Sequence, residues 1–294
     1  KLKKKIKKIH KENEINLNSD NKKLRQIASA MFFIDKLALR VGNEKTKDEA
    51  DTVGVSSLKV KHVSLKENNK LTLDFLGKDS IRYQNTIKVD NIIYNNIKEI
   101  SKNKNKDDDL FDLISSNDIN KYLQQFMKDL TAKVFRTFNA SKLFEKELKK
   151  IENKYNPEKT DMSIILDELK KANIKVAIVM NHQKNVSKGY KDQLDKISSY
   201  IRKLQSQLKK TKNAKTKNKD RINKLQQKID LFKKKKELRK QLKNISLETS
   251  KANYIDPRII FSFIKKYNIP ESKIYSTILV DKFKWAKNSE NYTF

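Results

Sequence analysis

The spacing of apolar residues changes several times along the chain, and each period predicts a different element. Over residues 21–41 the apolar positions recur at helical spacing and stop before Gly42, which predicts a helix that ends there. Apolar and polar residues then alternate over 58–65, 70–76 and 80–89, as in short strands. Asn-Asn and Gly-Lys-Asp separate these strands and are typical turn sequences, so we expect a small antiparallel sheet.

Helical spacing returns from residue 90 to about 181, and residues 190–246 then follow a heptad pattern. The apolar positions of this second stretch are Leu194, Ile197, Ile201, Leu204, Leu208, Ile222, Leu225, Ile229 and Phe232. Such a seam, interrupted by the polar TKNAKTKNKD, predicts two helices packed as an antiparallel coiled-coil hairpin. Residues 191–246 include 20 basic and 5 acidic residues, so we expect a basic arm that projects from the body.

These periods together predict an α+β fold that is mainly α, and the charge then indicates a partner. The chain of 294 residues carries a formal net charge of +32, from 68 Lys and Arg against 36 Asp and Glu. Each phosphate that a protein neutralises releases counterions, so a basic surface favours nucleic acid. We expect nucleic acid rather than a membrane as the partner, because no stretch combines bulky aromatics with a basic amphipathic face.

Several other kinds of chemistry are not expected from this sequence. It has no Cys, hence no disulfide or thiolate zinc site, and its three histidines lie far apart without a ligand cluster. It has neither a GxxxxGK[ST] nucleotide loop nor an apolar run long enough to span a membrane. The start, KLKKKIKKIH, lacks a Met and a signal-peptide core and begins within a helical pattern. We therefore expect a piece of a longer protein that needs neither a metal nor a cofactor.

One tyrosine stands out in TSKANYIDPRI, residues 249–259. Asp256 and Pro257 predict the start of a helix, with Asp as the cap and Pro in the first turn. Tyr254 would then lie just outside that helix, in a connector. Connector tyrosines often pack their rings, so position alone does not make this residue a nucleophile.

Four further groups lie in apolar or turn-rich surroundings: Arg40, Lys78, Arg136 and His182. Each alone has an ordinary explanation, such as an ion pair, an exposed turn residue or a hydrogen-bonded core histidine. As a set they suit phosphodiester chemistry. Guanidinium and imidazole groups stabilise the negative charge of a pentacoordinate phosphorus, and a lysine can protonate the leaving oxygen.

Several motifs resemble eukaryotic type IB DNA topoisomerase I. They are FFIDKLALRVGNEK, DTVGVSSL, DFLGKDSIRY, LTAKVFRTFNAS, NHQK and SKANYIDPRI, in that order, and the resemblance extends to KIYSTILVDKFKWA. It implies a DNA breaking-rejoining catalytic core like that of tyrosine recombinases. The implied domains are a core subdomain over 1–186, a coiled-coil linker over 187–246 and a C-terminal domain over 247–294. The N-terminal tail and the DNA-clamping cap half of the family would be missing.

The resemblance also implies roles for individual residues. Tyr254 would form the 3′-phosphotyrosyl bond, while Arg40, Arg136 and His182 would hold the phosphate oxygens. Lys78 would be the general acid and would touch the minor groove. Further DNA contacts are expected from Asp79, Asn253 and Lys133, and the first two match positions that line the camptothecin-type inhibitor site. NHQK differs from the more usual NHQR, but it keeps the histidine.

The implied activity is that of an isomerase, which relaxes supercoiled double-stranded DNA by nicking and resealing one strand without ATP or metal. We expect a monomer that acts in the nucleus. One alternative is a tyrosine recombinase-like strand transferase, but recombinases usually carry HxxR where this chain has Lys133-Val-Phe-Arg136, and they lack a long arm before the tyrosine. Another is a DNA-binding fragment that is inactive without the missing cap half.

Overall fold

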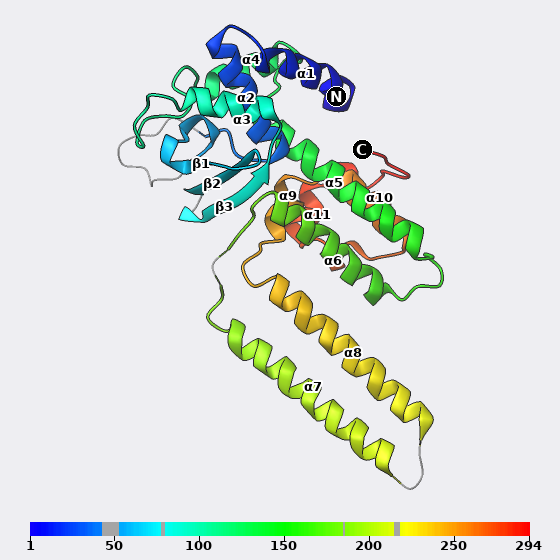
Figure 1. The fold of residues 1–294 in the computed structure, drawn as a ribbon. Helices are drawn as coiled ribbons and strands as arrows, with labels where there is room; N and C mark the ends of the chain where they lie inside the picture. The colour runs from blue at the N-terminus through cyan, green and yellow to red at the C-terminus, as the bar shows by residue number, and fades with distance from the viewer. Residues whose placement is uncertain (43–52, 78–79, 185, 215–217) are drawn as a thin grey trace.

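The computed structural model describes residues 1–42, 53–77, 80–184, 186–214 and 218–294 (Figure 1). The N-terminal part contains α1 (Leu2–Leu17), α2 (Lys22–Lys36), β1 (Val63–Lys66), β2 (Lys70–Leu76), β3 (Arg82–Lys88), α3 (Asn91–Ile100) and α4 (Ser116–Gln124). The remainder contains α5 (Ala132–Lys154), α6 (Met162–Val179), α7 (Tyr190–Asn213), α8 (Lys219–Gln241), α9 (Glu248–Asn253), α10 (Pro257–Lys266) and α11 (Thr277–Lys282). The fold is thus mainly helical with one small sheet, as the sequence predicts.

The sheet has three antiparallel strands in the order β1-β2-β3. Asn68 and Asn69 make the first turn with positive φ values of 58° and 54°, a conformation that Asn tolerates better than most residues. The first strand is shorter than predicted. Residues Val60–His62 form a 3₁₀ turn instead, because the backbone of Val60 and Lys61 bonds to the segment near Asp108 rather than to a strand.

Two hydrophobic cores share the long helix α5. Its N-terminal half, with Ala132, Phe135 and Phe138, packs into a core formed with α1–α4 and the sheet. Its C-terminal half, with Phe144 and Leu148, packs into a second core with α6 and α10. Because one helix enters both cores, residues in its middle are held rigidly between the two halves of the body.

The segment after α2 corrects one prediction. The helix ends at Lys36 instead of continuing to residue 41, because Ala38 adopts a left-handed conformation (φ 51°) and the Leu39 N–H donates to the Phe33 C=O. Arg40 therefore lies in a non-helical segment beyond the helix. The Val55 N–H donates to the Arg40 C=O at 2.9 Å and fixes this segment against the chain that follows it.

Two glycines allow that pairing. Gly42 has a φ of 89°, and a Cβ added to Gly54 would lie 2.2 Å from the Cα of Gly42. The two backbones approach so closely that no side chain fits between them. The position of Arg40 thus depends on glycine at residue 54.

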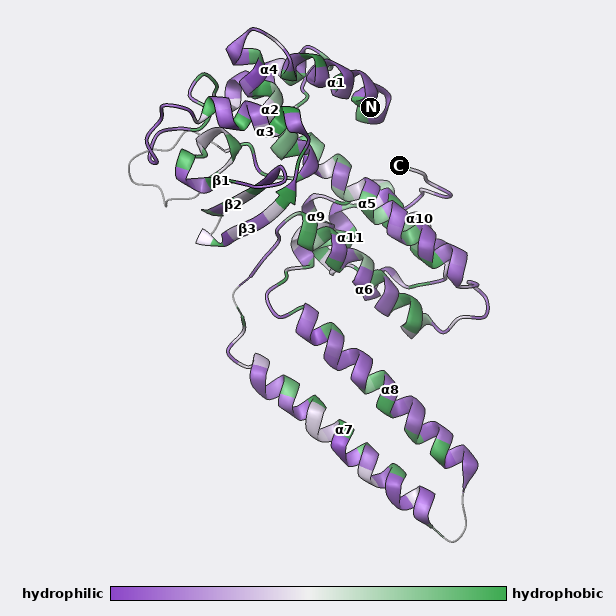
Figure 2. Cartoon of the chain, viewed as in Figure 1, coloured by the Kyte–Doolittle hydropathy of each residue, from purple (hydrophilic) through white to green (hydrophobic). Residues whose placement is uncertain are grey.

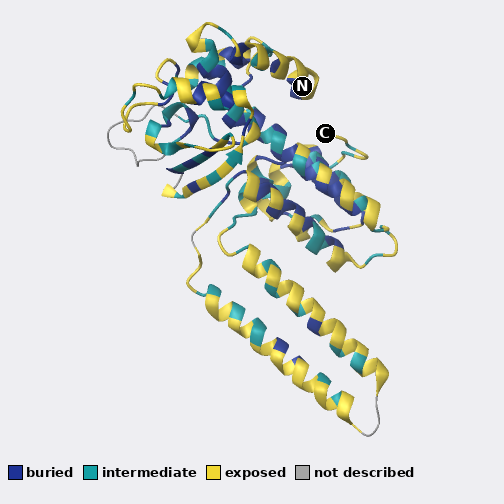
Figure 3. Ribbon diagram, in the orientation of Figure 1, coloured by how far each residue is buried: buried dark blue, intermediate teal, exposed yellow. Residues whose placement is uncertain are grey.

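Helices α7 and α8 lie side by side and extend away from the body (Figure 1). Most of their surface is hydrophilic and exposed (Figures 2 and 3). All nine predicted seam positions are buried or partly buried, and Ile201, Leu204 and Ile229 are the most buried. The Tyr200 and Phe232 rings also meet, with centroids 4.5 Å apart. Two packed helices therefore lie where the heptad pattern predicts a helical hairpin.

Candidate active site

Tyr254 lies in the connector between α9 and α10, as the sequence predicts. The Asp256 carboxylate accepts from the Arg258 N–H at 3.0 Å and caps α10, and Pro257 occupies the first turn. The polar residues before the tyrosine form the short helix α9, which the apolar pattern did not reveal. The Tyr254 N–H continues this helix by donating to the Ser250 C=O at 3.0 Å. The tyrosine is buried between the two helices rather than exposed on a loop.

Arg136, in the N-terminal half of α5, is buried and points at this tyrosine. Its Nη1 donates to the Tyr254 Oη at 2.9 Å, and the guanidinium carbon lies 4.7 Å from the ring centroid. Nε donates to the Ala38 C=O at 2.7 Å, and Nη2 donates to the Met180 C=O at 3.1 Å. A guanidinium has five N–H groups, so two have no acceptor among the described residues.

The charge of Arg136 is retained despite its burial. Desolvation lowers the pKa of its guanidinium to about 10, the interaction with Tyr254 opposes that shift, and the positive charge of Arg40 adds to it. The carbonyl of Met180, at the C-terminal end of α6, provides a compensating negative dipole. Arg136 is therefore a cation at neutral pH with its fork already oriented.

His182 is positioned by the end of α6. Asn181 is left-handed (φ 51°), its N–H donates to the Ile178 C=O, and the His182 N–H donates to the Ala177 C=O at 2.8 Å. These two bonds make a Schellman motif, which turns the chain sharply so that the histidine folds back onto the body. The His182 ring packs against the Tyr254 ring with centroids 4.9 Å apart.

The His182 ring is neutral at physiological pH. Burial lowers its pKa to about 3, and the positive charges of Arg136 and Arg40 contribute to the shift. Its Nδ1 lies 2.7 Å from the Ser250 Oγ. Its Nε2 is buried without a hydrogen-bond partner in the described parts of the chain.

Two serines that the sequence did not single out complete the arrangement. The Ser141 Oγ, on α5, donates to the Tyr254 C=O at 3.1 Å and accepts from the Asp256 N–H at 2.9 Å. Ser250, on α9, contacts His182 as described above, and both serines are fully buried. Ser141 lies in LTAKVFRTFNAS and Ser250 in SKANYIDPRI, but a serine within a helix gives no pattern by which to choose it.

The other predicted site residues are placed as follows. Arg40 lies near enough to Arg136 and His182 for its charge to act on both. Lys133 is exposed on α5 one turn before Arg136, and Asn253 is exposed beside Tyr254. Lys78 and Asp79 lie outside the described residues. The structure therefore brings together Arg40, Arg136, His182 and Tyr254 from four separate segments.

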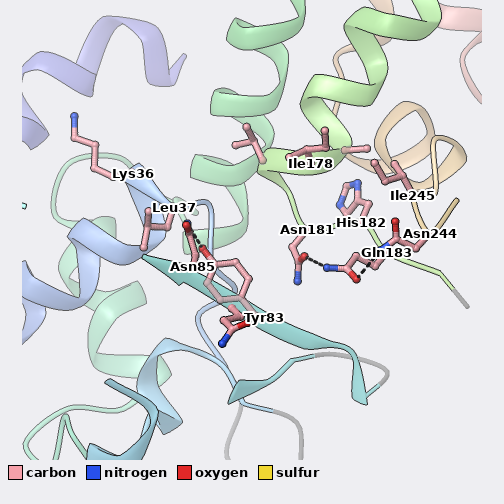
Figure 4. A pocket seen from close by; sticks show the side chains of 13 residues that line it. Lys36, Leu37, Tyr83, Asn85, Ile178, Asn181, His182, Gln183, Asn244 and Ile245 are labelled. Carbon is pink, nitrogen blue, oxygen red and sulfur yellow. Dashed lines mark hydrogen bonds between the residues drawn. The ribbon is translucent and has the colours of Figure 1, made fainter. Parts of the chain in front are cut away.

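A cleft of about 460 Å³ opens next to His182 (Figure 4). It lies between β3, which contributes Tyr83 and Asn85, and the end of α6. Its third wall is the base of the arm, where Gln183 and Ile245 form an antiparallel bridge. The Ser246 N–H also donates to the His182 C=O at 2.8 Å, so the base of the arm is attached directly to the site.

The described residues include no group of three acidic or histidine side chains that could hold a metal ion. None of the helices that the structure describes is long and apolar enough to cross a membrane. A phenol, a guanidinium and a neutral imidazole are in contact here, with the charge of Arg40 acting on two of them, a set suited to a phosphate group.

Two family models match successive parts of the chain. Residues 1–215 match the family described as eukaryotic DNA topoisomerase I, catalytic core, and residues 226–294 match the C-terminal topoisomerase domain. The chain is 37% identical to DNA topoisomerase 1 of Caenorhabditis elegans, in an alignment that covers all of this chain and 39% of that protein. It is 38% identical to DNA topoisomerase 1 of Homo sapiens, over all of this chain and 41% of that protein.

A third relative is the mitochondrial DNA topoisomerase I of Rattus norvegicus, 34% identical over 98% of this chain and 52% of that protein. The chain thus spans about two fifths to one half of the length of these three relatives. The matches to the two families follow one another along the sequence and together include every described residue of the candidate active site. The chain therefore belongs to the eukaryotic DNA topoisomerase I family.

Proposed function

We propose that the chain is the catalytic part of a type IB DNA topoisomerase, an isomerase that relaxes supercoiled double-stranded DNA. The observation that carries the proposal is the hydrogen bond from the buried Arg136 Nη1 to the Tyr254 Oη at 2.9 Å, with the His182 ring packed against the same tyrosine. A guanidinium that contacts the phenol oxygen stabilises negative charge on it and lies next to the place where phosphorus would be attacked.

In the proposed reaction the Tyr254 Oη attacks a backbone phosphorus, an O–P bond forms, and the bond from phosphorus to the 5′-oxygen breaks. The phenol gives its proton to solvent water, and the leaving 5′-oxygen gains one. We assign the second transfer to Lys78 from the family resemblance. The product is a 3′-phosphotyrosyl bond and a free 5′-hydroxyl.

The transition state gathers negative charge on its non-bridging oxygens. The two N–H groups of Arg136 without acceptors among the described residues, together with the Arg40 guanidinium, are suited to bind them. The Nε2 of His182 would add a further hydrogen bond. Because these groups are held by buried contacts before DNA arrives, little reorganisation is needed during the reaction.

Resealing would be the reverse attack, by the 5′-hydroxyl on the phosphotyrosine. The phosphodiester energy is conserved in that bond, so the cycle needs neither ATP nor a metal. Between the two steps the free DNA end can rotate about the intact strand, which removes supercoils.

We also propose the domain division given by the resemblance: a tyrosine recombinase-like core over 1–186, a coiled-coil linker over 187–246 and a C-terminal domain over 247–294. The packed helices α7 and α8 support the linker assignment. Exposed Lys133 and Asn253 would contact DNA, as would Lys78 and Asp79. The protein would act as a monomer in the nucleus, together with the DNA-clamping half that the resemblance implies.

The test is relaxation of a supercoiled plasmid in EDTA without ATP. We expect the wild-type chain, supplied with the clamping half, to produce a ladder of topoisomers that ends in relaxed DNA. Arg136→Ala, at matched DNA binding, should slow relaxation at least about 100-fold, the usual cost of removing a charge-stabilising donor. A plasmid that stays supercoiled with the wild-type chain would overturn the proposal.

A further inference from the structure

The buried contact between Ser250 and His182 has a defined direction. Both side chains are almost fully buried, and the Ser250 Oγ lies 2.7 Å from the His182 Nδ1. The hydroxyl proton must be donated to some acceptor, because a buried O–H left unpaired is costly. Nδ1 is the only acceptor in hydrogen-bond reach of Oγ among the described residues. Ser250 is therefore the donor, and Nδ1 is the nitrogen without a proton.

The other ring nitrogen then carries the proton. A neutral imidazole has one N–H, so an unprotonated Nδ1 leaves that proton on Nε2. The lowered pKa of His182 keeps the ring neutral, so the choice of tautomer decides what Nε2 can do. With the proton on Nε2 the ring can donate to a phosphate oxygen. In the other tautomer Nε2 would present a lone pair, which repels that oxygen.

Ser250 also holds the tyrosine. Its C=O accepts from the N–H of both Tyr254 and Ile255, each at 3.0 Å. One residue thus connects the ring of His182, through its hydroxyl, with the backbone that carries Tyr254. The loss of the hydroxyl alone leaves the backbone contacts in place, which makes the two roles separable by substitution.

We propose that Ser250 is a positioning residue that fixes the tautomer of His182, so that Nε2 donates a hydrogen bond to a non-bridging phosphate oxygen of the DNA. This inference rests on the proposed function for the identity of the acceptor. The tautomer itself is a property of the protein without DNA.

The first test reads the tautomer directly, by ¹⁵N NMR of histidine-labelled protein at neutral pH. His182 is assigned by comparison with His182→Gln. We expect a pyrrole-type Nε2 and a pyridine-type Nδ1 in the wild-type chain, and a change of tautomer or a mixture in Ser250→Ala. A protonated Nδ1 in the wild-type chain, or the same tautomer in both proteins, would overturn the inference whether or not the chain cleaves DNA.

The second test is a double-mutant cycle on the rate of single-turnover DNA cleavage. Ser250→Ala should slow cleavage about 10-fold or more in the wild-type background, as loss of a group that orients a functional histidine typically does. In a His182→Gln background it should have almost no effect, because the glutamine amide donates without a tautomer.

Ser262→Ala is the matched control. Ser262 lies on α10, and its hydroxyl accepts from the Tyr292 N–H at 3.0 Å rather than contacting His182. Its substitution should therefore leave the cleavage rate unchanged. An equal loss from Ser250→Ala in both backgrounds would mean that the serine only stabilises α9 and would contradict the inference. If no protein cleaves, the proposed function fails, and the NMR result still decides the role of Ser250.

Discussion

At the scale of the residue, the site consists of ionisable groups taken out of water and provided with fixed partners. Arg136 keeps its charge because its N–H groups meet the carbonyls of Ala38 and Met180 and the hydroxyl of Tyr254. His182 gives up its charge because burial and two nearby cations disfavour the imidazolium. At neutral pH Arg136 is therefore a cationic hydrogen-bond donor and His182 a neutral one. Both can bind an anion without gaining or losing a proton.

The neutral state of His182 predicts a loss of stability in acid. Its pKa is about 3 in the folded chain and about 6.5 when unfolded, so between these values the unfolded state binds the extra proton. The contribution of His182 to the free energy of unfolding is therefore unchanged above pH 6.5. Below that pH the free energy of unfolding falls by about 1.4 kcal/mol per pH unit, until the pH approaches 3.

The measurement is urea unfolding of the wild-type chain and His182→Gln at pH 7 and pH 5. The wild-type free energy of unfolding should fall by about 2 kcal/mol more than that of the variant, in which all other titrating groups are the same. An equal fall in both proteins would show that His182 is charged, or free to become charged, in the folded state.

The fixed fork of Arg136 predicts that lysine cannot replace it. Arg136→Lys keeps a charge but leaves at least one buried carbonyl unpaired, so we expect a loss of about 1–3 kcal/mol in unfolding free energy. Cleavage should fall at least about 100-fold. Lys133→Ala, exposed on the same helix, should change stability by less than about 0.5 kcal/mol. A fully active and stable Arg136→Lys would contradict the geometry.

At the scale of the element, helix ends determine where the functional groups lie. Arg40 follows the end of α2, His182 the end of α6, and Tyr254 the end of α9. Of these residues and Arg136, Arg136 alone lies within a helix, and that helix enters both hydrophobic cores. The turns after α2 and α6 use left-handed Ala38 and Asn181, so the direction of the following residue is set by backbone hydrogen bonds.

The close approach of Gly42 and Gly54 predicts a sensitive position. Gly54→Ala would place a Cβ 2.2 Å from the Gly42 Cα, so the segment that carries Arg40 must shift. We expect a loss of about 1–3 kcal/mol and a slower cleavage rate. The control is Gly189→Ala, where the added Cβ meets only the flexible end of Gln193 at 4.0 Å. Equal stability of the two variants by thermal unfolding would contradict this packing.

The sequence alone predicted the elements better than their ends. Alternation and heptad spacing gave the sheet and the arm, because a buried face must repeat with the period of its backbone. The end of α2 at Lys36 was missed, since left-handed Ala38 has no glycine to mark it. Ser250 and His182 are 68 residues apart, and no local pattern indicates that they meet. The family resemblance selected the candidate catalytic residues, while their supporting contacts required the structure.

At the scale of the whole molecule, the body holds the site and the arm carries much of the positive charge. Residues 190–241 include 19 basic and 5 acidic residues, and almost all of those that the structure describes are exposed (Figure 3). The arm is attached to the body through the Gln183–Ile245 bridge and the bond from the Ser246 N–H to His182. Its charge and its attachment can therefore be removed separately.

Replacing residues 190–241 with a short Gly-Ser loop should weaken DNA binding and flatten its salt dependence, because fewer phosphates are neutralised. Cleavage chemistry should persist, since the bridge at the base is retained. Extending the deletion through Ser246 should also slow cleavage by releasing His182. Anisotropy titrations at several salt concentrations measure the first effect and single-turnover cleavage measures the second. An unchanged salt slope after the shorter deletion would mean that the arm does not lie along DNA.

The most direct test of Tyr254 as the nucleophile is a suicide-cleavage assay. The substrate is a DNA duplex with a nick just downstream of the scissile position, labelled at one end or the other. It is mixed with the chain and the clamping half in EDTA, and covalent adducts are then separated from free DNA on denaturing gels. We predict a covalent adduct on the 3′-phosphate side with the wild-type chain and none with Tyr254→Phe, whose ring can still pack against His182. DNA that binds without any adduct, or an adduct that survives Tyr254→Phe, would contradict the assignment of Tyr254 as the nucleophile.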